Sequence, residues 1–247
     1  MEEFKKYGEH VHHLLLGDNL ASSVDDILSY CPNVKNLMMH WEPNRVAVSV
    51  LSKLPLTTLS MSAPIFLGNL HLYSRQHASA THLVGLGDRQ GPPMFPSVTH
   101  IDFICGAFFR DESEIQSSVL AHHFPSLTHI AVPGCMMKLA ELPPILTKCK
   151  NLEVLVSWRP GHLSTDLDTA LRAPPTDPRI IFLTMTRSVT WTEAAMGRSR
   201  SLWELADKVM AYRRMTLSRL SKEQDEADFD RLVKLAHTYG RYTVSRT

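Results

Sequence analysis

The chain has 247 residues, of which 44% are hydrophobic and 21% are charged, a balance that is typical of a folded globular protein with a sizeable core. Its formal net charge of +1 gives no global electrostatic basis for binding nucleic acid or a membrane surface. The chain shows no signal peptide and no apolar run near the roughly 18 residues of a membrane span, so we predict an intracellular protein, cytoplasmic or nuclear.

Four cysteines are spread along the chain, at Cys31, Cys105, Cys135 and Cys149. They form no CxxC pair and have no histidine partner at zinc-finger spacing, so we expect no metal site and no cofactor. Free cysteine behaves as a small apolar residue, and we therefore expect reduced and mostly buried thiols.

The first part of the chain repeats one apolar pattern. Residues 11–16, 34–39 and 56–61 each place apolar side chains at the first, fourth and sixth positions of the form LxxLxL. Between them the sequence predicts short helices, one ending at Tyr30 and one over residues 44–54. The repeated unit is therefore a strand, a turn and a helix.

The pattern weakens over residues 64–91. Residues 80–85 keep one strong apolar position, Leu83, and we interpret this stretch as a degenerate repeat with an insertion. The nearby glycines lack the GxGxxG spacing of a phosphate loop and are expected to be turn residues.

The pattern then returns in two near copies, residues 95–103 and 124–132, and again at 152–157. Helices are predicted over 112–123 and over 137–148, the latter bent or interrupted at Pro143-Pro144. Counted between the central apolar residues, the repeats are 18 to 29 residues long, which mostly fits a leucine-rich repeat. We therefore predict an α/β leucine-rich-repeat solenoid, with a parallel sheet on the concave face and helices on the convex face.

The pattern changes after Trp158. A proline-rich linker is followed by a predicted strand over 179–184, which could extend the sheet. Ser201-Leu-Trp-Glu204 has capping-box spacing and opens an amphipathic helix that continues to about Met215, and a second helix is predicted over 223–239. We accordingly divide the chain into a repeat domain, residues 1–185, and a C-terminal helical cap, residues 186–247.

The openings of the repeats resemble a known family. Cys-Pro-Asn-Val at 31–34 and Phe-Pro-Ser-Val or Phe-Pro-Ser-Leu at 95–98 and 124–127 are similar to the irregular, cysteine-containing leucine-rich repeats of fungal F-box proteins, over roughly residues 7–185. The resemblance implies the substrate-recognition part of a cullin-type ubiquitin ligase, in which the repeats hold the target. The first repeat begins within about ten residues of Met1 with no F-box before it, so a Skp-type adaptor is an expected partner only if an F-box exists outside this chain.

Histidines recur at one position of the pattern. The third position should face outward from the concave sheet, and it holds His13, Asn36, Thr58, His82, His100, His129 and Val154. Neighbouring imidazoles about 4.8 Å apart could contact a partner, share a metal or an acidic peptide, respond to pH, or simply be hydrated. A metal is disfavoured because only Asp102 supplies a carboxylate. With the fifth and seventh positions, the predicted partner-binding residues are His13, Met38, His40, His82, His100, Asp102, His129 and Trp158.

No catalytic signature such as GxSxG, HExxH or a Walker loop occurs in the sequence. We therefore expect a protein–protein interaction module rather than an enzyme, with a protein partner and neither nucleic acid nor membrane. A scaffold unrelated to ubiquitin ligases is the alternative.

Overall fold

A computed structural model gives the structure of the chain and describes it in nine stretches: residues 6–17, 24–39, 48–62, 70, 92–104, 113–133, 142–159, 177–184 and 202–217. The chain divides into two compact units. Unit 1 contains residues 1–130 and 136–152, and unit 2 contains residues 131–135 and 153–247. Each unit is described by itself below.

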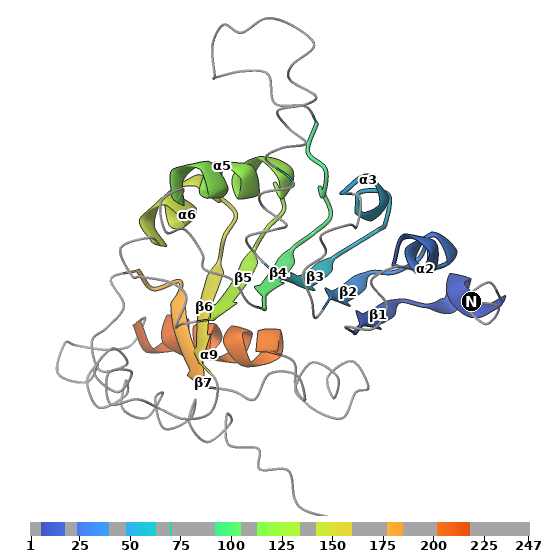
Figure 1. Cartoon of the computed structure of the whole chain (residues 1–247). Helices are drawn as coiled ribbons and strands as arrows, with labels where there is room; N and C mark the ends of the chain where they lie inside the picture. Colours follow the sequence, from blue (N-terminus) through green and yellow to red (C-terminus); the bar gives the residue numbers. More distant parts are fainter. Residues whose placement is uncertain are drawn as a thin grey trace, which may run out of the picture. The chain divides into compact units, whose positions relative to one another are not determined.

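The class of the fold is α/β, with a seven-stranded parallel sheet whose strands follow one another in sequence order. Figure 1 shows β1 to β4 of unit 1 side by side. The strands are β1 (His13–Leu16), β2 (Asn36–Met39), β3 (Thr58–Met61), β4 (His100–Phe103), β5 (His129–Pro133), β6 (Val154–Arg159) and β7 (Ile180–Thr184). The predicted class and the parallel sheet are thereby confirmed.

The sheet corrects the prediction of a repeat strand at residues 80–85. β3 pairs directly with β4, so that Thr58 lies opposite His100 and Met61 lies opposite Phe103. No strand from the 38 residues between Met61 and His100 can therefore stand between these two. β3 and β4 therefore belong to neighbouring repeats.

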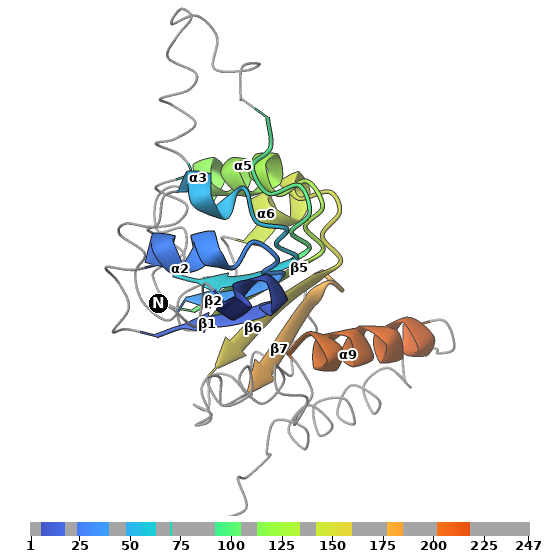
Figure 2. The same cartoon turned by 90° about the vertical axis from the view of Figure 1, so that its right-hand side faces the viewer.

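Short helices cover one face of the unit 1 strands, as Figure 2 shows. In α2 the buried residues Val24, Ile27 and Leu28 have the i, i+3, i+4 spacing of an apolar helix face. α2 packs against α3, and α5 packs against α6. The elements are the 3-10 helix η1 (Gly8–His10), α2 (Val24–Tyr30), α3 (Val48–Leu51), α5 (Ser113–His123) and α6 (Leu142–Lys148).

The predicted helices differ from the observed ones mainly at their ends. α5 matches its prediction to within one residue, whereas α3 ends three residues earlier than expected. Pro143 and Pro144 do not interrupt α6, because they occupy its first turn, where a helix needs no backbone N–H. The helix predicted over 223–239 lies outside the described residues.

Four of the repeats enter their strands through the same turn. The N–H of the fourth residue donates to the carbonyl of the first, at 3.4 Å for Val34 and Cys31 and at 3.1 Å for Leu127 and Phe124. Both residues of each turn are buried, and so are their equivalents at 95 and 98 and at 149 and 152. The Cys-Pro-Asn-Val and Phe-Pro-Ser-Leu openings are thus a packing motif, in which an apolar residue at each end of the turn points into the core.

These turn residues are part of the buried apolar core. The rings of Phe95 and Phe124 stack with their centroids 5.0 Å apart. Cys31 and Cys149 are buried free thiols, as predicted, and burial raises the pKa of the Cys149 thiol to about 11. Such a thiol stays protonated and unreactive at neutral pH.

His123, at the end of α5, is a buried histidine in this core, with 3% of its surface exposed. Burial, and then repulsion by the neighbouring His122, lower its pKa to about 4, from 6.5. The ring of His122 lies edge-on to it, with the centroids 4.7 Å apart.

We expect unit 1 to lose stability in mild acid because of His123. Its folded pKa lies below its unfolded value, so its contribution to stability is complete above pH 6.5 and is lost as the pH falls towards 4. Urea unfolding between pH 7 and pH 4.5 should show a falling midpoint, and His123→Leu should reduce that fall. His10→Gln, at an exposed histidine, is the control; equal pH dependence in both variants would contradict the assignment.

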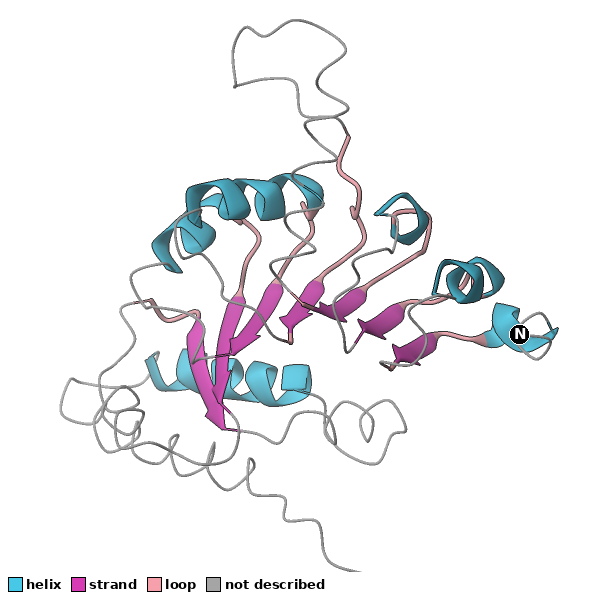
Figure 3. Ribbon diagram, viewed as in Figure 1, coloured by secondary structure: helices cyan, strands magenta, loops and turns pink. Residues whose placement is uncertain are grey.

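Unit 2 contains a second core, between its strands and the helix α9 (Leu202–Leu217). Figure 3 shows α9 lying across β6 and β7. Buried Ala206 and Met210 pack on alternate residues of β6, namely Val154, Val156 and Trp158, with Leu202, Trp203 and Val209 at the margin. The predicted helix is confirmed. The strand predicted over 179–184 is confirmed as β7, which pairs with β6 in parallel.

Within the described parts of the chain, no helix combines the length and the apolar character that crossing a bilayer requires.

Candidate functional site

One face of the unit 1 sheet carries a line of polar side chains from the third position of each repeat. Strand register places His13 opposite Asn36, Asn36 opposite Thr58, and Thr58 opposite His100. The ring of His129 stacks on the ring of His100. These five residues are called the histidine row, and the predicted alignment of the third positions is confirmed for each of them.

The two C-terminal histidines of the row lie face to face. The ring centroids of His100 and His129 are 4.3 Å apart, and the ring planes differ by 15°. Equivalent residues of neighbouring parallel strands are about 4.8 Å apart, so the sheet itself sets this separation. A face-to-face stack directs the ring nitrogens alongside one another rather than towards a common point.

A threonine holds each of these rings in place. Thr99 and Thr128 precede the two histidines, and their hydroxyl oxygens lie 2.8 Å and 2.7 Å from the Nδ1 atoms of His100 and His129. The Thr99 hydroxyl also donates to the backbone carbonyl of Thr57, at 3.3 Å, and the Thr128 hydroxyl to that of Thr99, at 3.1 Å. Each acceptor occupies the equivalent position in the preceding repeat. The Thr-His pair is therefore one structural device, repeated on neighbouring strands.

This geometry assigns a tautomer to both rings. A carbonyl oxygen can only accept, so each threonine proton is donated to it and the hydroxyl oxygen accepts from the imidazole Nδ1–H. The neutral rings of His100 and His129 then carry their lone pair on Nε2.

His13, at the other end of the row, has the opposite tautomer. The Asn36 amide donates to its Nδ1 at 2.8 Å. The Thr57 hydroxyl lies 3.2 Å from both the Asn36 amide oxygen and the Lys35 carbonyl oxygen, either of which can accept its one proton. Nδ1 of His13 is therefore an acceptor, and its Nε2 carries the proton. Unlike the other rings, His13 offers an N–H at the surface.

Access to the row decreases along the sheet. His13 is exposed, the next three residues are partly buried, and His129 is 7% exposed. The part of the row that a partner can reach therefore extends from His13 to His100.

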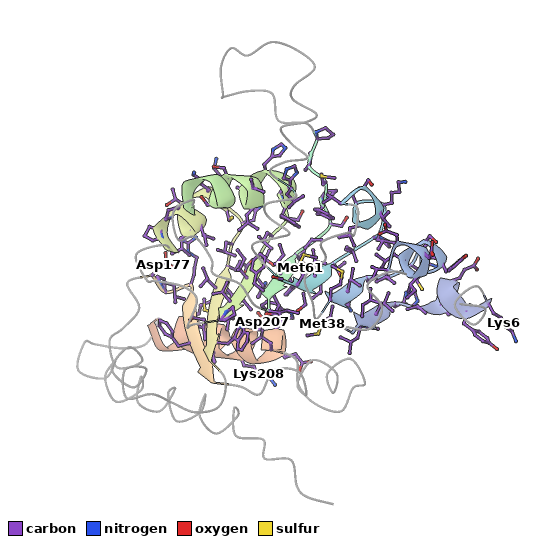
Figure 4. The ribbon with its side chains drawn as sticks, in the orientation of Figure 1. Lys6, Met38, Met61, Asp177, Asp207 and Lys208 are labelled. Atoms are coloured by element: carbon purple, nitrogen blue, oxygen red, sulfur yellow. The ribbon has the colours of Figure 1, made fainter. Side chains whose placement is uncertain are left out.

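A second line on the same face is formed by the fifth positions, and it is buried in the strands that follow β1, whose own Leu15 is exposed. Strand register aligns Met38, Ser60 and Asp102, which are 0%, 0% and 6% exposed. The Ser60 hydroxyl donates to a carboxylate oxygen of Asp102 at 3.0 Å. Figure 4, in which Met38 and Met61 are labelled, shows these methionines projecting from opposite faces of the sheet.

The structure corrects the expected exposure of four predicted site residues. Met38, Asp102 and His129 lie on the expected face of unit 1 but are buried. Trp158 is 6% exposed and belongs to the core of unit 2, because α9 covers the alternate side chains of β6. The two remaining predicted residues, His40 and His82, lie outside the described residues.

Among the described residues, no group of three or more His, Cys, Asp or Glu side chains could hold a metal ion. The combination of Ser60, Asp102 and His100 has the composition of a catalytic triad but not its geometry. The serine proton is donated to the carboxylate rather than to an imidazole, and the serine is fully buried.

Sequence reasoning found the row but missed the threonines that orient it. Their signal was the duplication of Thr-His, rather than His alone, at 99–100 and 128–129, together with Thr57 at the equivalent position. Comparison with models of known protein families finds no match to the chain, and a search of curated proteins finds no similar sequence.

Proposed function

We propose that the chain is a leucine-rich-repeat solenoid that serves as a protein-interaction module, with the accessible part of the histidine row as its contact surface. The observation that carries this proposal is the alignment of four polar side chains, from His13 to His100, across four neighbouring strands. Stacked repeats use such extended surfaces to bind other chains.

The row suits binding because its side chains are held in place before a partner arrives. The Asn36 amide holds His13, and the Thr99 hydroxyl holds His100. Side chains that are already ordered lose less conformational entropy on association, which favours affinity. The row also combines N–H donors with nitrogen and oxygen acceptors, which favours a partner with polar, hydrogen-bonding groups.

The resemblance of the repeat openings to those of F-box proteins suggests the class of partner. We propose a protein that is recognised as the target of a cullin-type ubiquitin ligase, with a Skp-type adaptor joining through an F-box outside this chain. A scaffold that binds its partner without ligase subunits is the alternative, and the experiment below separates the two.

The test is purification of the tagged chain from its own cells, identification of bound proteins by mass spectrometry, and measurement of the Kd of the recovered partner. We expect His100→Ala/His129→Ala to weaken binding by about tenfold or more, because it removes the stacked pair. Co-purified Skp-type adaptor would support the ligase role, and a partner without ligase subunits would support the scaffold.

Two variants control for folding. His129 is buried, so the paired variant should lose about 1–2 kcal/mol of stability while remaining folded. His100→Ala alone alters the more accessible ring, and His10→Ala removes an exposed histidine from η1, away from the sheet. Full binding by the paired variant, with native melting behaviour, would contradict the role of the row.

A further inference from the structure

Each strand of unit 1 is joined to the preceding repeat by the same pair of hydrogen bonds. The N–H groups of the second and third positions both donate to a single backbone carbonyl, that of the second position in the preceding repeat. The donor pairs are Lys35 and Asn36 to His12, Thr57 and Thr58 to Lys35, Thr99 and His100 to Thr57, and Thr128 and His129 to Thr99, at 2.7–3.1 Å.

The first repeat has the same two donors, and no acceptor for them lies in the part of the chain that the structure describes. His12 and His13 occupy the second and third positions, and among the described residues no carbonyl accepts their N–H groups. β1 is the first strand in the sheet order, and Figure 1 shows no described strand beyond it. The donor pair therefore faces the free edge of the sheet.

The sequence of this edge strand, which has four residues, contains none of the residue types that usually protect an edge. Lysine, proline and inward-pointing charges normally prevent further strand pairing, yet residues 12–16 are His-His-Leu-Leu-Leu and contain none of them. The two exposed large hydrophobic side chains in the described part of the chain, Tyr7 at 53% and Leu15 at 39%, both belong to this first repeat. Leu15 therefore places an exposed apolar side chain on the edge strand itself.

We propose that the free edge of β1 binds an extended segment of a partner protein, which adds to the sheet as a parallel strand. The hydrogen bonds repeated between the other strands specify the chemistry of this segment. One of its carbonyls accepts from both His12 and His13, and its side chains beside Leu14 and Leu16 are apolar, because those two leucines point into the core. Main-chain hydrogen bonds supply affinity, and the apolar side chains supply specificity.

A second copy of the chain fits this edge less well. Two β1 edges related by a two-fold axis run antiparallel. In an antiparallel pair, one carbonyl does not take the place of the acceptor that receives two consecutive N–H groups at each of the four parallel strand pairs. The proposal goes beyond the contact surface proposed above, because it uses the backbone of β1 rather than the side chains of the histidine row.

The test uses the full chain and a synthetic peptide that copies residues 32–39, which present the Lys35 carbonyl to the next strand in the native sheet. We expect the peptide to slow amide hydrogen exchange at His12, His13 and Leu15 by about tenfold or more at saturation. Exchange is followed residue by residue by NMR.

Two variants at one position separate the backbone from the side chain. His13→Pro removes the outward N–H, a change that an edge strand tolerates, and should abolish peptide binding. His13→Ala removes the imidazole but keeps the N–H, and should bind the peptide as the parent chain does. If His13→Pro melts below the parent chain, Leu15→Lys places a charge on the edge instead and should weaken binding at least about tenfold.

Three results would overturn the proposal. These are unchanged exchange of the β1 amides at saturating peptide, equal protection in His13→Pro and His13→Ala, and protection without peptide. Protection that grows with chain concentration would identify a second copy as the occupant. Protection that is independent of concentration would identify another part of the same chain.

Discussion

Replacing Ala206 by arginine should detach α9 from the strands of unit 2. Ala206 is fully buried and packs in the cluster that contains Val154, Val156 and Trp158. A long charged side chain at this position must either be buried without a partner or push the helix away. Overpacking and the burial of a charge together should cost at least about 3 kcal/mol.

The same helix supplies the control. Ala211 lies on its exposed side, so Ala211→Arg introduces the same side chain into water and should change stability by less than about 0.5 kcal/mol. Urea unfolding gives the free energies, and the fluorescence of Trp158 and Trp203 reports whether the helix has left the sheet. Coincident unfolding curves for the two variants would show that α9 does not depend on this contact.

The histidine row could be predicted because two simple periods determine it. Side chains alternate between the faces of a strand, and the repeat places the same position of the pattern on each successive strand. His13, Asn36, Thr58 and His100 therefore align whatever the lengths of the segments between them. The repeat pattern, rather than any single residue, contained this information.

The exposure of the row and its neighbours could not be predicted in the same way. Trp158 follows the alternation as expected, but α9, more than 40 residues later in the chain, covers it. The sequence predicted an amphipathic helix there, but periodicity does not tell which surface its apolar face will cover. Met38 lies on the predicted face and is nevertheless fully buried.

The insertion between β3 and β4 was misjudged for a related reason. One strong apolar residue, Leu83, at a tolerable spacing was interpreted as a further repeat. The entropy of closing a loop grows only slowly with its length, so neighbouring repeats can pair directly across a long insertion, as Thr58 and His100 do. A single apolar position is too weak a signal to place a strand.

Replacing Gly8 by alanine should destabilise the first repeat, although the sequence around this glycine gives no hint of it. Gly8 is buried, and a Cβ atom there would overlap the backbone carbonyl of Tyr30, at the end of α2. The absence of a side chain is what allows η1 to approach α2 so closely. Since backbone cannot move aside as a side chain can, we expect a loss of about 3 kcal/mol in the free energy of unfolding.

Gly17 is the matched control for Gly8. It lies on the other side of β1, and a Cβ atom there would meet nothing within 4 Å. Gly17→Ala should be neutral, or stabilising by about 0.5 kcal/mol through the reduced entropy of the unfolded chain. Urea unfolding of the two variants, with amide exchange at Leu14 and Leu16, measures both stability and the attachment of β1. If Gly8→Ala were as stable as Gly17→Ala, η1 would not pack on α2, and the donors at His12 and His13 would lose the support that holds them at the edge of the sheet.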